Sequence, residues 1–538
     1  MVKKVKLFIV LVICIVVTML AGCSDSRDAK SDSIHYEKQT ELVYASAKDI
    51  NDMNPHLYAG SMPAQGMVYE SLVENTKTGI KPLLAESWEI SEDGKVYTFY
   101  LRGDVKFHDG EPFNAEAAKQ NIEAIQSNKE KHTWIKLSTK LVGVKAVDEY
   151  TVELTLSEAY APALDELSMT RPYVFISPNS FIDGETKNGV NGYNGTGPYK
   201  LMEHKTDEYA SFQANEEYWG GEPDIKTVIS KVLPAGETTF LALQKGEINF
   251  VFTDDRGADS IDIEAMDQLV ESDNYQLVRS EVMNTKMIVA NSSKQGSPVN
   301  EKAVRESIWH AIDRDTISKD IFNGTETAAH SLFSANVNYA NIELKKRDYD
   351  LETAKQMLEE AGWELDNGAV IRTKADKKLA IQLYYDSNSS SQKTQAEFIQ
   401  GSLKEIGVQL EIIGEESTSI ANRRSTGDYD LLFNQTWGLA YDPHSTIAAF
   451  TSANAYLHTT SGIANATELY KKIDEVMVTM DEDTRKSLYA DIMRMVHDEA
   501  VFIPVTNGSV TVVASKELKN IMFKQTQFEL PFERLSFE

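Results

Sequence analysis

The alternation of strand and helix patterns between residues 378 and 413 most constrains how this chain can fold. Residues 378–385 (KLAIQLYY) and 407–413 (GVQLEII) are short runs rich in apolar and β-branched residues, as strands are. Residues 391–406 between them have the length and pattern of a helix. A strand–helix–strand order predicts an α/β fold, with a mixed sheet and helices on its faces.

The length of the chain predicts more than one lobe. About 500 residues remain after the N-terminal segment described below, and one hydrophobic core rarely supports so many. The hydrophobic content of 42% and the charged fraction of 25% are ordinary for globular proteins. At least two lobes are therefore expected.

The N-terminus has the pattern of an export signal. Three lysines precede an apolar run, residues 7–20, which is shorter than the roughly 20 residues that a bilayer requires. Residues 1–22 are therefore predicted to be a signal peptide. The ending Leu-Ala-Gly-Cys23 resembles the lipobox of bacterial lipoproteins. This resemblance implies that Cys23 carries the lipid that anchors the protein to the outer face of a Gram-positive-type cell membrane. The alternative is an ordinary signal peptide in which Cys23 has no role.

Composition excludes several kinds of site and partner. The polar residues 23–36 after the signal predict a flexible tether. The only cysteines are Cys14 and Cys23, so the mature domain has no disulfide, thiolate metal site or cysteine nucleophile. The formal net charge of −28 argues against nucleic acid as a partner. Solubility explains this charge equally well, so it indicates no particular ligand.

Residues 423–454 combine a short apolar run with polar and aromatic side chains. Leu431, Leu432 and Phe433 predict a buried strand, and the following Gly-Leu-Ala-Tyr-Asp-Pro segment predicts a loop. Aromatic and polar groups at the end of a strand are common in small-molecule pockets. A buried tryptophan, a capped turn and solvated arginines would give the same pattern. These residues alone leave both interpretations open.

Residues 84–115 form the longest recognisable motif. Trp88 and Ile90 alternate with polar residues, the turn at 92–94 follows, and apolar residues alternate again up to Leu101, which predicts a hairpin. Pro112 and Asn114 then predict the start of a helix. Nothing in this motif indicates catalysis.

The same motif resembles the signature of the solute-binding proteins that serve peptide and nickel ABC importers, extracellular family 5. Further landmarks of that family follow in the same order at residues 195–199, 215–220, 304–314, 349–363 and 502–504. The resemblance implies a monomer with the two-lobed, periplasmic-binding-protein-like fold (class C). Lobe I would hold residues 37–281 and 506–538, and lobe II residues 282–505. Two crossings, near Val282 and Thr506, would let the lobes close on a ligand.

Within that family, residues 54–58 (NPHLY), 132–134 (HTW), 169–173 (MTRPY) and 436–444 (TWGLAYDPH) resemble the members that bind nickel and metallophores. Residues 252–257, 283–286 and 428–437 resemble more narrowly a member that binds metal–staphylopine complexes. The implied function is extracellular capture of nickel, cobalt or zinc held by an organic chelator, with delivery to an ABC permease and ATPase. Nickel–histidine binding and then oligopeptide binding are the alternatives.

Two arginines correspond by position to residues that bind ligand carboxylates in this family. Arg171 matches a carboxylate clamp, and its planar, permanently charged fork suits that role. The ordinary alternative is an ion pair with an acidic residue of the protein itself. Arg424 matches a second carboxylate-binding arginine, with its neighbour Arg423 as the weaker candidate.

The residue at position 454 bears on how a metal would be held. Nickel–histidine binders have a metal-ligating histidine where Asn454 falls here, and asparagine is a poor ligand for such metals. We therefore predict no direct protein ligand to the metal, although another placement of the gap would bring His458 into reach. The remaining predicted walls of the ligand site are Tyr58, Trp134, Trp437 and Tyr441.

No enzyme is predicted. The ten histidines show no H-x-x-x-H spacing, and the G-x-S-x-G motif is absent. His56 and His132 are predicted to sit in packed turns, and His444 to be structural or to lie behind the site.

Overall fold

The computed structural model describes residues 40–253, 261 and 263–538. The predicted signal peptide, the tether, Cys23 and residues 254–257 of one family landmark lie outside the described residues. Within the described ranges, no helix is both long enough and apolar enough to cross a membrane.

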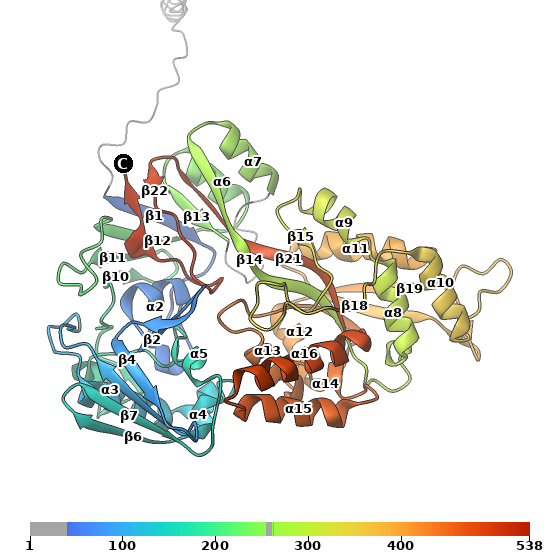
Figure 1. Ribbon diagram of the computed structural model, residues 1–538. Helices are drawn as coiled ribbons and strands as arrows, with labels where there is room; N and C mark the ends of the chain where they lie inside the picture. Colours follow the sequence, from blue (N-terminus) through green and yellow to red (C-terminus); the bar gives the residue numbers. More distant parts are fainter. Residues whose placement is uncertain (1–39, 254–260, 262) are drawn as a thin grey trace, which may run out of the picture. The chain divides into compact units, whose positions relative to one another are not determined.

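The largest sheet has eleven strands and mixes parallel with antiparallel pairs, which confirms the predicted α/β fold. Its order is β10-β11-β12-β1-β13-β21-β14-β20-β18-β19, and β15 pairs with β21 (Figure 1). The strands are β1 (Glu41–Ser46), β10 (Tyr199–Lys205), β11 (Tyr209–Ala214), β12 (Thr227–Val232), β13 (Phe250–Phe252), β14 (Tyr275–Ala290), β15 (Thr327–Ala328), β18 (Ala380–Asp386), β19 (Gln409–Glu415), β20 (Leu431–Gln435) and β21 (Phe502–Ser515).

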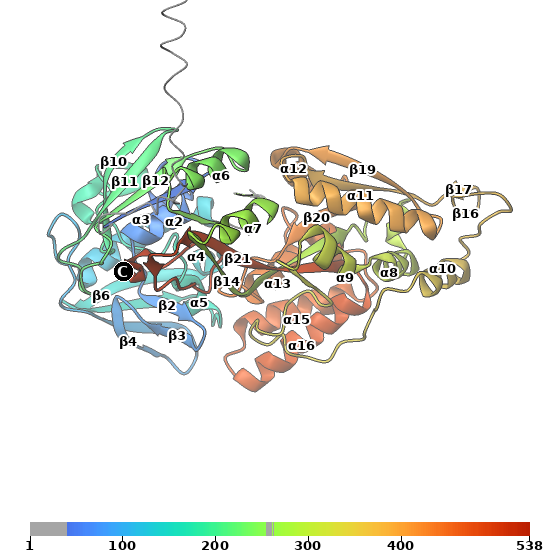
Figure 2. The same ribbon diagram turned by 90° about the horizontal axis from the view of Figure 1, so that it is seen from above.

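The two longest strands form the middle of this sheet. β14 and β21 pair antiparallel from Tyr275↔Ser515 to Val289↔Phe502, and the register shifts three times between Arg279 and Met287. Strands of the first part of the chain continue the sheet beyond β13, and strands of residues 380–415 continue it beyond β20 (Figure 2). The predicted crossings near Val282 and Thr506 fall on this pair, and the lobe boundaries themselves remain a prediction.

The strand–helix–strand unit predicted at residues 378–413 is confirmed. β18 and β19 pair in parallel, and α11 (Ser390–Glu405) connects them. Ser389 caps α11 by accepting a hydrogen bond from the Gln392 amide. β20 lies on the other side of β18 and begins with the fully buried Leu431 and Leu432, as the apolar run predicted.

The predicted hairpin and the helix after it are also confirmed. β4 (Ala85–Ile90) pairs with β5 (Val96–Leu101) and places Trp88 opposite Phe99. A four-stranded sheet, β4-β5-β7-β6, is completed by β6 (Leu141–Asp148) and β7 (Thr151–Leu156). Asn114 caps α3 (Ala115–Ser127) through the Ala117 amide, and α3 packs on β6 and β7.

The remaining elements are shorter or lie outside these two sheets. The helices are α2 (Met62–Val68), α4 (Leu137–Lys140), α5 (Ala163–Leu167), α6 (Glu237–Gln244), α7 (Ile263–Glu271), α8 (Lys302–Ala311), α9 (Arg314–Thr316), α10 (Leu351–Glu360), α12 (Ser417–Thr426), α13 (His444–Ala448), α14 (Leu457–Thr460), α15 (Ala466–Val478) and α16 (Glu482–Asp498). Single turns are η1 (Pro55–Leu57), η2 (Lys129–His132), η3 (Pro178–Ser180), η4 (Pro298–Asn300), η5 (Ile317–Ile321), η6 (Ala449–Thr451) and η7 (Phe532–Arg534). The two-stranded pairs are β2 (Val73–Thr76) with β3 (Gly79–Pro82), β8 (Phe181–Ile182) with β9 (Glu185–Val190), β16 (Thr373–Lys374) with β17 (Lys377–Lys378), and β22 (Leu518–Lys519) with β23 (Ser536–Phe537).

One helix prediction is wrong in its extent. The apolar pattern predicts a single helix over residues 304–317, but α8 ends at Ala311 and Ile312 is extended. Asp313 caps a new turn through the Thr316 amide. The Arg314 guanidinium donates to the carbonyls of Trp309 and Ile312, which satisfies oxygens that the continuing helix would otherwise have used.

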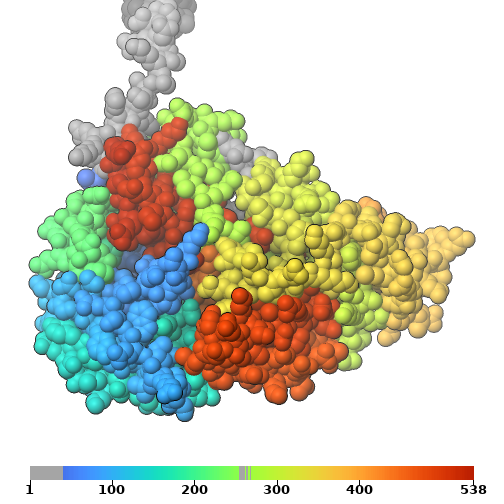
Figure 3. All heavy atoms as spheres, viewed as in Figure 1, coloured from blue at the N-terminus to red at the C-terminus, as the bar shows by residue number. Residues whose placement is uncertain are grey.

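An extended segment of residues 329–350 runs over α16. In Figure 3 this segment (yellow) and α15–α16 (orange-red) lie side by side on one face. Tyr339 stacks on Tyr489 with ring centroids 4.8 Å apart, and Arg347 donates to the His497 carbonyl. These contacts fix α16 against a stretch of chain that has little secondary structure of its own.

Candidate ligand site

Arg171 lies buried after α5, with only 4% of its surface exposed. The peptide bond to Pro172 is cis. The Arg171 Nη1 donates hydrogen bonds to the carbonyl oxygens of Ala59 (3.2 Å) and Gly60 (3.3 Å). These oxygens orient the guanidinium fork but carry no full negative charge of their own. An oriented, buried guanidinium is suited to bind a carboxylate in bidentate fashion.

Two half-exposed aromatic rings stand beside this guanidinium. The Tyr58 ring lies over the Arg171 Cζ at 4.4 Å, and the Trp134 ring meets Tyr58 edge-on at 5.6 Å. Tyr58 is 40% exposed and Trp134 is 38% exposed, so both offer ring surface to solvent. The structure therefore brings three of the seven predicted ligand residues together, as a cation with aromatic walls.

Two histidines support the loop that carries Tyr58, and both sit in packed turns as predicted. His56 is bonded through Nδ1 to the Thr186 hydroxyl and through Nε2 to the Val174 carbonyl, both at 3.0 Å. His132 Nε2 donates to the His56 carbonyl at 2.9 Å. Burial lowers the pKa of His56 to about 4, so its imidazole is neutral at physiological pH.

Gly60 is required where this loop turns toward Arg171. Its φ is +86°, and a Cβ there would lie 2.4 Å from the Asp52 carbonyl oxygen. We expect Gly60→Ala to lower the free energy of unfolding by about 1–3 kcal/mol, since the crowded loop must shift. It should also weaken ligand binding, because the displaced carbonyl is one that holds Arg171. Urea unfolding and ligand titration measure the two effects.

Gly221 provides the matched control for Gly60. Its φ is +96°, but a Cβ there would meet nothing within 4 Å. Gly221→Ala therefore carries only the strain of the left-handed backbone. Equal losses of stability and affinity in the two variants would contradict the role given to Gly60.

Arg424 lies at the end of α12, a helix with no buried residue. The side chain is half-buried, and among the described residues its Nε has no hydrogen-bond partner. Its charge acts on two neighbouring phenols, those of Tyr429 and Tyr456. Burial raises the pKa of Tyr429 to about 12, and Arg424 opposes that rise. Arg424 thus has unused hydrogen-bonding capacity, as a ligand-binding arginine would.

Arg423 is fully engaged by the protein, which agrees with its ranking as the weaker candidate. Its Nε and Nη2 bind both oxygens of the Glu415 carboxylate at 2.7 Å, and Nη1 pairs with Asp428 at 2.8 Å. Its guanidinium also lies 4.2 Å from the centroid of the Tyr384 ring. This is the ordinary structural use of an arginine.

Asn454 and His458 differ in their surroundings. Asn454 is exposed in the turn between η6 and α14. His458 lies in α14, half-buried, with Nε2 at 3.2 Å from the carbonyl of Ser425 in the last turn of α12. His458 thus contacts the helix that carries Arg424. A ligand contact by either residue remains a prediction.

The loop after β20 places its two aromatic candidates differently. Trp437 is 45% exposed, whereas Tyr441 is buried with its ring 5.9 Å from that of Phe528. Asp442 fixes the loop by accepting hydrogen bonds from the Gly438 amide (3.0 Å) and the Thr446 hydroxyl (2.5 Å). Of this pair, only Trp437 presents ring surface as a wall would.

The sequence did not predict the two main-chain carbonyls that orient Arg171. Ala59 and Gly60 contribute only main-chain atoms, and Gln65 Nε2 donates to the same Ala59 oxygen at 2.7 Å. Gly60 was the one available signal, since a glycine after a turn often has a positive φ. Among the described residues, no group of three or more His, Cys, Asp or Glu side chains is placed to hold a metal ion.

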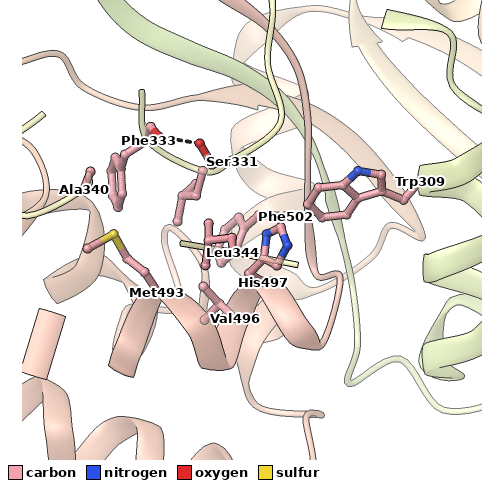
Figure 4. Close-up of a pocket in the computed structure, with 10 residues that line it drawn as sticks. Trp309, Ser331, Phe333, Ala340, Leu344, Met493, Val496, His497 and Phe502 are labelled. Atoms are coloured by element: carbon pink, nitrogen blue, oxygen red, sulfur yellow. Dashed lines mark hydrogen bonds between the residues drawn. The ribbon is translucent and has the colours of Figure 1, made fainter. Parts of the chain in front are cut away.

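A small cavity lies beside α16, among residues distant in sequence from Arg171. It is lined by Trp309, Phe333, Met493, His497 and their neighbours, as Figure 4 shows. Its volume of about 10 Å³ is comparable to a single water molecule. This cavity is a packing defect beside α16 and is too small for an organic ligand.

Comparison with known proteins identifies the family. The model of bacterial extracellular solute-binding proteins, family 5 (middle part), matches residues 79–457. The nickel-binding periplasmic protein of Escherichia coli (strain K12) is 38% identical over 505 residues, which cover 93% of this chain and 95% of that protein. The dipeptide-binding protein of the same organism is 27% identical over 512 residues, 89% of this chain and 91% of that one.

A solved structure agrees with these sequence matches. The crystal structure of NikA from Brucella suis in complex with Fe(III)-EDTA superposes with a TM-score of 0.89 at 37% identity. The match covers 93% of this chain and all of that one. The predicted two-lobed, periplasmic-binding-protein-like fold is thereby confirmed. The chain belongs to the bacterial extracellular solute-binding proteins of family 5.

Proposed function

We propose that this protein captures a transition metal held by a carboxylate-bearing chelator and delivers it to an ABC importer. The observation that carries the proposal is the buried Arg171 fork, oriented by two carbonyls, beside the exposed rings of Tyr58 and Trp134. A guanidinium binds the carboxylate of a chelate without competing for its metal. Nickel is the first candidate metal because of the Escherichia coli relative, and cobalt and zinc suit the same nitrogen and oxygen donors.

The relatives support a chelate as the ligand. The Brucella suis relative was crystallised with Fe(III)-EDTA, a metal enclosed by several carboxylates. Arg424, whose Nε has no hydrogen-bond partner in the part of the chain that the structure describes, would provide a second cation for such a ligand. Asn454, Trp437 and Tyr441 complete the proposed site, with His458 as the substitute for Asn454. We propose that a metallophore of the staphylopine kind is the natural chelator and that lipidated Cys23 holds the protein on the outer face of the membrane.

Native mass spectrometry of the membrane-extracted protein tests this function. The protein is incubated separately with nickel alone, nickel with histidine, nickel with EDTA or another polycarboxylate chelator, and a mixture of short peptides. We expect retention of the nickel–polycarboxylate complex and little retention of nickel alone, because the proposed site binds the chelator. The same spectra report whether the chain begins at a lipid-modified Cys23.

Each other outcome would point to a different function. Retention of peptides without metal complexes would contradict the proposal and favour the dipeptide-binding relative as the functional model. Retention of nickel–histidine but not of polycarboxylate chelates would favour the nickel–histidine alternative.

A further inference from the structure

A cavity of about 320 Å³ is lined by none of the residues of the proposed metal-chelate site. Residues 75–97 and 161–165 form one side, and residues 338–339, 442–444 and 480–489 form the other. The first set falls in the predicted lobe I and the second in the predicted lobe II. The Ala161 amide donates to the Met477 carbonyl at 2.9 Å and joins the two sides directly. The volume lies in the range of small-molecule sites.

One wall of this cavity is aromatic. Tyr339 and Tyr489 are stacked with an interplanar angle of 23°, and Tyr97 lines the same space. Ile80, Pro162 and Met480 add apolar surface. Arg485 holds the stack in place, because its Nη2 donates to the Tyr339 hydroxyl at 2.6 Å. Electron-rich faces of tyrosine rings attract cations when water is partly excluded.

Asp165 is an acidic group in this cavity with little compensation. Its carboxylate accepts a hydrogen bond from Asn75 Nδ2 at 3.3 Å and one from its own backbone amide, and it forms no ion pair with any described residue. Arg485, a cation that lines the same cavity, is paired with Glu482 instead. Burial raises the pKa of Asp165 to about 6 despite the attraction of Arg485. A carboxylate in these surroundings would be stabilised by a further cation.

His444 also lines this cavity, and it has a buried ring nitrogen without a partner among the described residues. The residue is 5% exposed, and this nitrogen is Nε2. Burial and the charge of Arg485 lower its pKa to about 3, so the imidazole is neutral. In the tautomer protonated at Nδ1, Nε2 accepts a hydrogen bond from an N–H donor.

We propose that this cavity binds a small organic amine in its protonated form. Asp165 would be the counter-ion, His444 Nε2 an acceptor for an ammonium N–H, and the Tyr339–Tyr489 stack the wall for the apolar part. The bound amine would bridge the two sides of the cavity and so favour the arrangement in which they touch.

Isothermal titration calorimetry with three ligands of one shape tests the proposal. Benzylamine, benzyl alcohol and benzoate share a ring but are cationic, neutral and anionic at pH 7.5. We expect benzylamine to bind at least tenfold more tightly than either of the others. Binding that does not depend on charge, or tighter binding of benzoate, would overturn the proposal.

Variants locate the amine in the full-length protein. Asp165→Asn should weaken benzylamine binding at least tenfold, whereas Asp491→Asn on α16, which removes a carboxylate paired with Lys472 outside the cavity, should leave binding unchanged. If Asp165→Asn fails to fold, Tyr489→Leu and Tyr489→Phe provide the second comparison. Leucine should weaken binding about fivefold or more, and phenylalanine should preserve it. Equal affinities in both members of either pair would overturn the proposal.

A competition experiment separates this site from the metal-chelate site. Protein saturated with a nickel–polycarboxylate complex should still bind benzylamine, because the two sites share no residue. Displacement of one ligand by the other would place the amine in the metal-chelate site and overturn the inference. Binding of benzylamine by protein that retains no metal complex would support this cavity while contradicting the proposed function.

Discussion

Replacing Arg171 with alanine should lower the affinity for a nickel–polycarboxylate complex by about 100-fold. A hydrogen bond to a charged group contributes about 1.5–3 kcal/mol, and each 1.4 kcal/mol corresponds to a tenfold change in affinity. The variant loses the proposed bidentate contact with the ligand carboxylate and also the cation beneath the Tyr58 ring. Titration calorimetry with the intact chelate measures the loss directly. Arg171→Lys should recover only part of the affinity, because lysine keeps the charge but not the planar fork.

Arg423 is the matched control for this experiment. Arg423 is a half-buried arginine of the candidate region, but Glu415 and Asp428 already occupy its guanidinium. Arg423→Ala should therefore change affinity by less than about threefold, although it removes the same formal charge. Arg424→Ala removes an arginine whose Nε has no partner among the described residues. Its loss of affinity should lie between those of Arg171→Ala and Arg423→Ala. Similar losses in Arg171→Ala and Arg423→Ala would show that only long-range charge matters and would remove Arg171 from the site.

The parts of the fold that follow from local pattern could be predicted from the sequence. Alternation around a turn predicted the β4–β5 hairpin. The sequence after Asp350 is an amphipathic run, which by itself predicts a helix, and there the structure has α10 with Asp350 accepting from the Glu352 and Thr353 amides. Both depend on residues a few positions apart. The apolar run at Leu431 likewise predicted a buried strand without any knowledge of its partners.

The geometry of the candidate site depends on contacts between distant parts of the chain. The carbonyl that holds Arg171 comes from Ala59, 112 positions earlier, and no side-chain pattern encodes a main-chain acceptor. The resemblance ranks Arg424 above Arg423, but only the structure shows that Glu415 and Asp428 occupy the guanidinium of Arg423. The burial of Tyr441 likewise depends on a distant partner, because its ring packs 5.9 Å from that of Phe528.

The hydrophobic periodicity of the family landmark at residues 304–314 also did not predict that its arginines are buried. Val304 and Ile308 define the apolar face of α8 as predicted, yet Arg305 is only 1% exposed. Its Nε donates to the Glu499 carbonyl, its Nη1 to the carbonyls of Val299 and Asn300, and its Nη2 pairs with the Glu499 carboxylate at 3.1 Å. This one side chain joins the start of α8 to the residue that follows α16.

Arg305→Ala should accordingly lower the free energy of unfolding by about 3–5 kcal/mol, since breaking a buried ion pair leaves the partner charge uncompensated. Lys302 gives a matched control, because its Nζ approaches the same carboxylate at 3.7 Å but its side chain is 44% exposed. Lys302→Ala should cost no more than about 1 kcal/mol. Urea unfolding followed by tryptophan fluorescence compares the two. A difference of less than 1 kcal/mol between them would mean that Glu499 is adequately solvated without Arg305, and that the landmark arginine is not a structural link between α8 and α16.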